Sequence, residues 1–333
     1  MRTLQKHRTI LLRIMMSLLG LTAAAGAMWW ALFSLKPYGI TPEALQARYE
    51  HKVPASRATA VRLGPVQQTT VGSTGAWATE LRFASFDGDE VVGRLVLPDD
   101  PQRRDANAPP RPVLLALHGM NRTHWRWWLA EFKGRPTFES THLLAEQALQ
   151  RGHAVLALDA RWHGERKDPQ QPAFVNEMMD DLHLWGRREP YERLIVDTVK
   201  DYRMLLDWVQ LQPQFDATRV RAAGYSMGAQ MALLLAAADS RVRSVAAMVP
   251  PHVDNKVAVV APINVAPRLK EVQVWLLTGH GDQYATAQQN AQLFAALPGP
   301  GRQHLSFPGG HLLATDYVAN LEEWWREDGS APR

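Results

Sequence analysis

From residue 113 onward the chain alternates short apolar runs with longer helical patterns, and this alternation limits the possible folds more than any other feature. Short apolar runs are typical of buried strands, and strands separated by helices form βαβ units. Such units predict an α/β fold with a mainly parallel sheet and helices on both faces. The strand patterns lie at residues 113–117, 154–158, 220–223, 242–249 and 272–277, with a weaker one at 304–307. The helical patterns lie at residues 140–151, 191–211, 227–238, 285–296 and 312–326.

Two further strand patterns precede this region. Residues 79–86 alternate in part between apolar and polar side chains, and residues 90–97 are rich in valine and leucine. The turn sequence Asp87-Gly88-Asp89 lies between them, which predicts a hairpin.

The remaining segments define the expected organisation. Residues 1–35 form an N-terminal membrane anchor or signal peptide, and residues 36–78 form a polar connector with one helical stretch near 42–49. The main domain covers residues 79–333. An insertion at about 161–192 interrupts its alternation, and a segment of that length is either a lid or an elaborated loop.

Residues 14–35 form an uncharged apolar run. About 20 such residues cross a hydrocarbon core of roughly 30 Å. The basic residues before the run are expected to stay in the cytoplasm, so that the main domain lies on the outer side of the membrane. These residues are Arg2, Lys6, Arg8 and Arg13.

Two interpretations of this run remain open. Ala25-Gly26-Ala27 fits the small-residue pattern of a signal-peptide cleavage site, which predicts a secreted or periplasmic protein. The run continues past that point to Leu35, which favours an uncleaved signal anchor. Trp29 and Trp30 lie near its far end, where aromatic side chains suit the membrane interface.

Composition excludes several classes of site. The chain has no cysteine, which rules out disulfides, thiolate metal sites and a cysteine nucleophile. The formal net charge is +4, but the basic residues are spread along the chain and mixed with acids. A nucleic-acid-binding protein would gather them on one element, so we expect no nucleic-acid partner.

A candidate nucleophile lies in Gly224-Tyr225-Ser226-Met227-Gly228, a G-x-S-x-G sequence. It follows a strand pattern and precedes an apolar helical one. A sharp strand-to-helix turn exposes the serine hydroxyl at a helix N-terminus, and the turn needs small neighbours. This context predicts Ser226 as nucleophile, whereas a serine that merely caps the helix is the simpler alternative.

A serine needs a base, and the chain order expected on such a fold is serine, acid, histidine. His311 follows Gly309-Gly310 just after the last strand pattern, and we expect it to be the base. His304 lies within that strand, which indicates a structural role. His252 and His280 lie in earlier loops and are weaker candidates.

The acid would hold the imidazole in the required tautomer and stabilise the imidazolium. We expect Asp282, because it follows the strand pattern at 272–277 within a loop that contains Gly279 and Gly281. Asp254, in the loop after the preceding strand, is the rival.

The oxyanion of a tetrahedral intermediate needs backbone donors. The Met227 N–H follows the nucleophile, and the Met120 N–H lies in the loop after the strand at 113–117. His118, in the same loop, is open to interpretation as a third base or a metal ligand, but a positioning role is favoured.

Together, these motifs resemble the α/β-hydrolase superfamily over residues 79 to 326. The nearest branches are the dienelactone-hydrolase-like and acetyl-xylan-esterase-like enzymes. The matching pieces are Asp87-Gly88 with Gly93 and Pro98, His118-Gly119, the loop from Asp159 to Gly164, the serine turn, Gly279 with Asp282, and Gly310-His311. The resemblance implies an eight-stranded sheet and an acyl-enzyme mechanism, with the loop from Asp159 to Gly164 as a structural element near the site. Dienelactone hydrolases have a cysteine where this chain has Ser226.

The expected function is therefore hydrolysis of a small-molecule carboxylic ester by a Ser226–Asp282–His311 triad, with no metal or organic cofactor. A peptidase or thioesterase would use the same triad, and a non-catalytic envelope binding protein would keep the same fold. The aromatic residues after the oxyanion loop, among them Trp125, Trp127 and Trp128, either stack on a substrate or pack within the domain, and packing is favoured.

Overall fold

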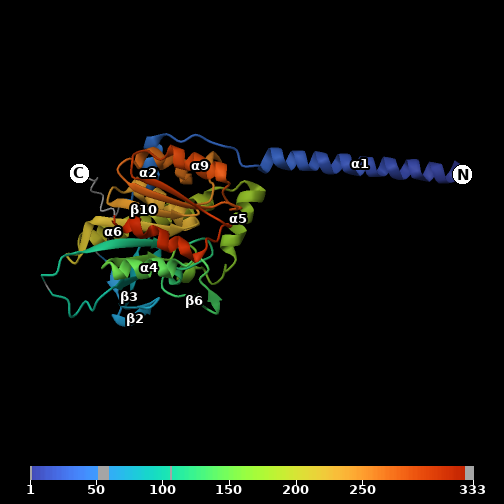
Figure 1. Cartoon of the computed structure of the whole chain (residues 1–333). Helices are drawn as coiled ribbons and strands as arrows, with labels where there is room; N and C mark the ends of the chain where they lie inside the picture. Colours follow the sequence, from blue (N-terminus) through green and yellow to red (C-terminus); the bar gives the residue numbers. More distant parts are fainter. Residues whose placement is uncertain (1, 52–59, 106, 327–333) are drawn as a thin grey trace.

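Figure 1 presents the computed structural model, which describes residues 2–51, 60–105 and 107–326. Part of the expected connector, residues 52–59, lies outside the described residues. The main strands are β1 (Arg62–Leu63), β2 (Gln67–Val71), β3 (Thr74–Ala84), β4 (Glu90–Leu97), β5 (Arg111–Leu117), β8 (Ala154–Leu158), β9 (Phe215–Tyr225), β10 (Val242–Met248), β11 (Gln273–Gly279) and β12 (Arg302–Phe307). The α-helices are α1 (Arg2–Phe33), α2 (Pro42–Tyr49), α4 (Thr141–Gln150), α5 (Phe174–Trp185), α6 (Glu189–Gln210), α7 (Met227–Ala238), α8 (Pro262–Val265), α9 (Ala287–Ala296) and α10 (Glu322–Arg326).

The strands form one large sheet in the order β1-β3-β4-β8-β5-β9-β10-β11-β12, and β2 pairs with β3. The pairs from β8 to β12 are all parallel, whereas β3, β4 and β8 pair antiparallel. The predicted α/β fold class is confirmed, and each of the eight predicted strands is present. The described part of the sheet has ten strands rather than eight, because β1 and β2 both pair with the outer strand β3.

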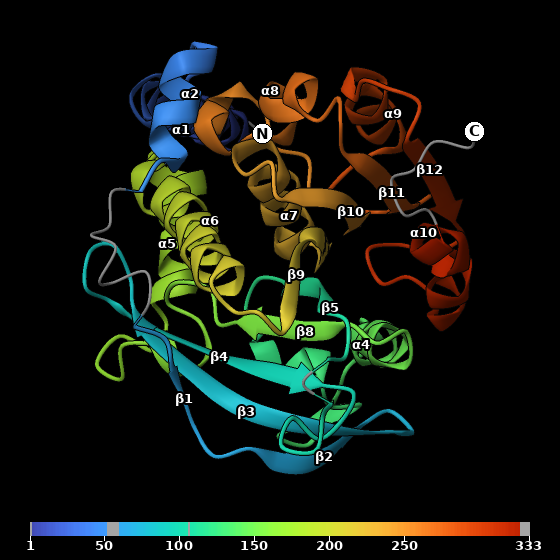
Figure 2. The same ribbon diagram turned by 90° about the vertical axis from the view of Figure 1, so that its left-hand side faces the viewer.

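Helices cover both faces of the sheet, and each face has its own apolar core (Figure 2). Successive side chains of a strand point to opposite faces. In β5, Leu115 and Leu117 accordingly pack in the core beneath α6 and α7, and Leu114 and Ala116 pack in the core beneath α4 and α10. Burial on both faces explains why these strands have continuous apolar sequences.

Two segments differ from the sequence pattern. The pattern at 312–326 predicted one helix, but the chain forms a 3₁₀ segment, η5 (Thr315–Leu321), before the short α10. The insertion at 161–192 contains α5 and the start of α6. In the range expected to be a connector, the predicted helix is α2, while β1 and β2 were not expected.

Helix α1 projects from the domain (Figure 1). Its apolar part, Leu11–Phe33, has 23 residues and is not buried. At 1.5 Å per residue it is about 35 Å long, enough to cross a bilayer. One such helix near the N-terminus is compatible with either a signal anchor or a signal peptide.

His153, which follows α4, provides a test of the fold through pH. Its ring is buried edge-on against Trp325 of α10, with 5.1 Å between the ring centroids. Burial, with a smaller contribution from nearby arginines, lowers the pKa of His153 to about 3, against 6.5 ordinarily. Below pH 6.5 the unfolded chain therefore binds a proton at this site that the folded chain does not. The contribution of neutral His153 to the free energy of unfolding is therefore complete above pH 6.5 and is lost as the pH falls toward 3.

We expect His153→Phe to reduce this loss. Between pH 7.5 and pH 5.0, the free energy of unfolding of the variant should fall by about 2 kcal/mol less than that of the wild type, since one pH unit corresponds to about 1.4 kcal/mol per proton. Urea unfolding at the two pH values measures the difference. An equal loss in both proteins would show that His153 titrates normally in the folded chain.

Candidate active site

Ser226 lies at the junction of β9 and α7, as the sequence predicted. Its backbone has φ 57° and ψ −119°, a conformation that residues other than glycine rarely adopt. Such strain persists only where the surroundings enforce it, and it is common at functional sites.

The two flanking glycines explain how this turn is possible. A Cβ on Gly224 would lie 2.1 Å from the Gly228 carbonyl oxygen, and a Cβ on Gly228 would lie 2.1 Å from the Leu117 carbonyl oxygen. Larger residues at either position would therefore push α7 away from the strands. The glycines of the motif bring the helix N-terminus close to the ends of β9 and β5.

Three predicted residues meet at this turn. His311 Nε2 lies 2.8 Å from Ser226 Oγ, and His311 Nδ1 lies 2.9 Å from Asp282 Oδ2. Asp282 follows β11 and His311 follows β12, so both lie at the carboxyl edge of the sheet. A Cβ on Gly279 would lie 2.1 Å from the Gly310 carbonyl oxygen, so this glycine lets the two loops pack closely.

The side chains differ in exposure. Asp282 is 1% exposed and His311 is 13% exposed. The Tyr284 N–H also donates to Asp282 Oδ1, at 2.8 Å. A buried carboxylate that accepts from both an imidazole and an amide fixes the direction of the ring, and leaves His311 Nε2 directed at the serine hydroxyl.

The rival residues do not reach Ser226. Asp254 Oδ1 accepts from the Lys256 N–H at 2.8 Å and caps a 3₁₀ segment. His304 Nε2 bonds the Thr278 hydroxyl at 2.8 Å within the sheet. His252 and His280 lie in other loops, and neither has a hydrogen bond to the serine or to Asp282 among the described residues.

The two expected oxyanion donors belong to segments next to Ser226. The Met227 N–H is the first of helix α7, and the first amides of a helix have no acceptor within it. Met120 follows Gly119, where a Cβ would lie 3.6 Å from Ser226 Cβ. The loop that carries the Met120 amide thus lies against the serine.

His118 supports this loop. Its Nδ1 lies 2.8 Å from the Gly119 carbonyl oxygen, so Nδ1 carries the proton, and Nε2 accepts from the Ala160 N–H at 2.9 Å. Burial lowers the pKa of His118, which keeps this neutral tautomer. Both ring nitrogens are occupied, which supports the positioning role over a third base or a metal ligand.

Asp159 ties the next loop to the same region. Its carboxylate accepts from the His124 N–H and the Glu165 N–H, both at 2.9 Å, and pairs with His124 Nδ1 at 3.0 Å. Burial alone would raise the pKa of Asp159, but the hydrogen bond and charge of His124 lower it to about 2. The carboxylate therefore acts as a charged structural anchor, in agreement with the role that the resemblance implied for this loop.

The aromatic residues that follow the oxyanion loop pack within the domain. Trp127 and Trp128 are buried, and Trp125 stacks on Phe132 with 5.9 Å between the ring centroids. In the insertion, Trp162 packs edge-on against Phe174. Among the described residues we find no group of three histidines or acids that would hold a metal ion.

Tyr225 is a site residue that the sequence did not single out. Its hydroxyl donates to the His311 carbonyl oxygen and accepts from the Leu313 N–H, both at 2.9 Å. The variable position before the serine therefore holds the loop that carries His311. No sequence signal marks it, because that position of the motif accepts many residue types.

We expect Tyr225→Phe to lower kcat by about 10-fold, because a less well oriented His311 takes the proton from Ser226 more slowly. KM should change little. Stability should fall by about 1–3 kcal/mol, since a buried amide and a partly buried carbonyl of the backbone lose their partner. Kinetics and urea unfolding measure the two effects. Tyr202→Phe is the matched control, because its hydroxyl also donates to one backbone carbonyl and accepts from one backbone amide, those of Ala116 and Leu158. A similar loss of kcat in both variants would contradict the positioning role.

Comparison with known proteins agrees with this fold. A model of the alpha/beta hydrolase family matches residues 113–330. No curated protein sequence matches the chain. Three solved structures have a similar fold. Their sequence identities to this chain are low, so the likeness concerns the fold alone.

The acetyl xylan esterase from Paenibacillus sp. R4 superposes with a TM-score of 0.61 at 17% identity, over 86% of this chain and 99% of that one. Acetyl xylan esterase 1 from Thermoanaerobacterium sp. JW/SL YS485 has a TM-score of 0.57 at 16% identity, over 88% and 100%. A cold-adapted esterase from an Arctic intertidal metagenomic library has a TM-score of 0.54 at 18% identity, over 78% and 97%. The resemblance predicted from the motifs is confirmed. The family model covers well over half of the residues and the sheet has the matching topology, so the chain belongs to the alpha/beta hydrolase family.

Proposed function

We propose that the chain is a serine hydrolase that cleaves a carboxylic ester through an acyl-enzyme. Ser226 is the nucleophile, His311 the base and Asp282 the acid that orients it. The observation that carries the proposal is the continuous contact from Ser226 Oγ through His311 to a buried Asp282, at 2.8 Å and 2.9 Å.

The reaction has two steps. His311 Nε2 takes the proton from Ser226 as Oγ attacks the ester carbonyl, and the resulting tetrahedral oxyanion accepts hydrogen bonds from the Met227 and Met120 amides. His311 then protonates the departing alcohol, which leaves an acyl group on Ser226. A water, deprotonated by His311, attacks this acyl group and releases the acid.

The helix supports the same chemistry. Ser226 precedes the first residue of α7, and the positive end of a helix dipole stabilises negative charge that develops nearby. A serine held at positive φ for a purely structural reason would not require a histidine and a buried carboxylate in line with its hydroxyl. This arrangement favours the enzyme over a non-catalytic binding protein.

We further propose that residues 1–35 are an uncleaved anchor and that the catalytic domain expected at residues 79–333 lies outside the cytoplasmic membrane. Residues 36–78 join the two, and β1, β2 and the first residues of β3 within this range extend the sheet of the domain. The apolar part of α1 continues to Phe33, beyond the possible cleavage site at Ala27. Immunoblotting of membrane fractions for the full-length chain tests this assignment, and a shortened soluble product would contradict it.

Hydrolysis of p-nitrophenyl acetate and butyrate by the full chain in lipid vesicles tests the activity. We expect turnover of both esters and little turnover of a peptide p-nitroanilide, because the amine is a poorer leaving group. A preference for the anilide or for an acyl thioester would replace the ester assignment by one of the two related hydrolase activities. Inactivity on all three classes would favour the binding protein.

A further inference from the structure

A cavity of about 540 Å³ lies between the end of α1, helix α5 and the loop after β10. Cavities of 300–1,000 Å³ are typical of small-molecule sites. Trp30 and Leu35 contribute one wall, Met179 and Leu182 of α5 a second, and Val253 a third. Half of the sixteen lining residues are apolar, and the polar or charged ones are Ser34, His183, His252, Asp254, Lys256 and Gln283, besides two tyrosines. The apolar half gives an aliphatic group a continuous surface to contact.

A single side chain, that of Tyr284, lies between the cavity and the proposed base His311. Tyr284 lines the cavity, and the Tyr284 ring lies edge-on to the His311 ring with 4.6 Å between the centroids. Gln283, which also lines the cavity, has Oε1 3.6 Å from where a Cβ on Gly310 would lie. Neither Ser226 nor His311 lines the cavity, so an acyl chain held there would pass Tyr284 for its carbonyl to reach Ser226.

Helix α5 is held at both ends. At its N-terminal end Asn176 Oδ1 accepts from Asn121 Nδ2 at 3.0 Å, next to the loop of Met120. At its C-terminal end Trp185 contacts Phe33 of α1 edge-on, with 5.0 Å between the centroids. The helix thus connects the proposed oxyanion loop to the end of the membrane-compatible helix.

The junction of α5 with α1 is close. Gly186 has φ +64°, and a Cβ there would lie 2.4 Å from the Phe33 carbonyl oxygen. Two residues later, Arg188 Nη2 donates to the Lys36 carbonyl oxygen at 2.9 Å. Figure 1 shows α5 beside the point where α1 leaves the domain. The end of α1 is therefore packed firmly against α5 and forms part of the cavity wall.

The outer edge of the cavity adjoins an exposed apolar surface. Trp30 is 64% exposed, and Leu184 and Trp185 of α5 are nearly half exposed. Tryptophan at the end of an apolar helix is typical of the membrane interface. With α1 in a bilayer, this edge would lie where the lipid headgroups begin.

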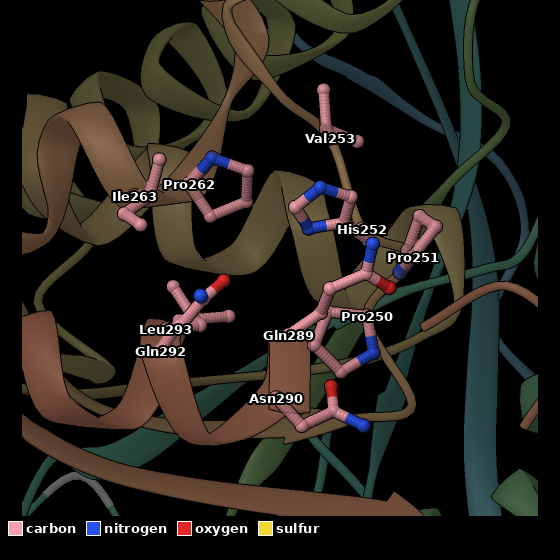
Figure 3. A pocket seen from close by; sticks show the side chains of 10 residues that line it. All are labelled: Pro250, Pro251, His252, Val253, Pro262, Ile263, Gln289, Asn290, Gln292 and Leu293. Atoms are coloured by element: carbon pink, nitrogen blue, oxygen red, sulfur yellow. The ribbon is translucent and has the colours of Figure 1, made fainter. Parts of the chain in front are cut away.

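A second hollow, on the other side of residues 250–253, is too small to be an alternative site for an acyl chain. It is lined by Ile263 of α8, Leu293 of α9 and His252, among others (Figure 3). Its volume is about 20 Å³, which holds about one water molecule.

We propose that the substrate is an ester with an aliphatic acyl chain of eight or more carbons, and that this chain occupies the larger cavity while the ester carbonyl lies at Ser226. This inference rests on the proposed function and adds the class of acyl group. The cavity walls, including the end of α1, then select chain length, and the anchor holds the entrance at the membrane surface.

The test uses the full chain in lipid vesicles with p-nitrophenyl acetate and p-nitrophenyl octanoate. We expect kcat/KM for the octanoate to exceed that for the acetate by at least 10-fold. Met179→Trp fills part of the cavity and should lower this ratio by at least 10-fold. The matched control is Asp180→Trp, an exposed neighbour on the same helix that does not line the cavity, and its ratio should equal that of the wild type.

A wild-type preference for acetate, or an unchanged ratio in Met179→Trp, would overturn the acyl-chain inference and leave the ester hydrolase intact. Failure to hydrolyse either ester would overturn both. A second arm places a phosphatidylcholine in the same vesicles. Released fatty acid identifies a lipid of the bilayer as the source of the acyl chain, whereas turnover of the dispersed octanoate alone identifies a diffusible amphiphile, and either result supports the cavity as the acyl site.

Discussion

Replacement of Ser226 by alanine is expected to lower kcat for p-nitrophenyl acetate by about 10⁴-fold to 10⁶-fold, as removal of a nucleophile does in serine hydrolases. Alanine removes Oγ, which lies 2.8 Å from His311 Nε2, so no acyl-enzyme can form. Folding should be little affected, because the backbone of the turn is held by the flanking glycines and by the Ser226 N–H, which donates to the Met248 carbonyl oxygen. Ester hydrolysis and urea unfolding measure the two properties.

The matched control is Ser240→Ala. Ser240 is an exposed serine beyond the C-terminal end of α7, at the opposite end of that helix from Ser226. Its variant should hydrolyse the ester at the wild-type rate. Retention of more than a tenth of the wild-type rate by Ser226→Ala would mean that another group carries the reaction.

Asp282→Asn is expected to lower kcat by about 10⁴-fold while the fold is retained, because an amide can donate to His311 Nδ1 and so favours the wrong tautomer of the ring. The carboxylate is 1% exposed and lies 2.9 Å from that nitrogen, so no water can take its place without rearrangement. The effect should appear in kcat more than in KM, since the acid acts on the reacting proton rather than on bound substrate.

Asp254→Asn provides the control, because Asp254 is the other acid at the carboxyl edge that the sequence offered. Its carboxylate caps a 3₁₀ segment and is 45% exposed. This variant should hydrolyse acetate within a few-fold of the wild type. The opposite ranking of the two variants would transfer the orienting role from Asp282 to Asp254.

The central sheet was predictable because each of its buried strands is a continuous apolar run. In β8, for example, Ala154–Leu158 are all buried on both faces. The edge strands β1 and β2 could not be predicted, because their sequences, Arg62–Leu63 and Gln67–Val71, are mostly polar and exposed. They join the sheet through backbone pairing with β3, which side-chain patterns do not reveal.

Helical spacing was a weaker guide near the C-terminus. Residues 312–326 have apolar side chains three and four positions apart, and the pattern predicted one helix. A 3₁₀ segment has a similar period of three residues per turn, so Tyr317 and Leu321 of η5 are buried without an α-helix.

At the site, motif and chain order were sufficient to nominate Ser226, Asp282 and His311, in which the histidine lies within hydrogen-bonding distance of the other two. Tyr225 was not predictable, because its role depends on where a loop 86 residues away returns. The cavity was not predictable either, since its walls come from Trp30, Met179 and Val253, which only the tertiary fold brings together.

Mass spectrometry of the full chain, quenched in acid during turnover of p-nitrophenyl butyrate, detects the proposed acyl-enzyme directly. We expect one butyryl group per chain, located by peptide mapping on Ser226 and absent from the Ser226→Ala variant. A butyryl group on another residue, or turnover with no acylated chain, would contradict this mechanism.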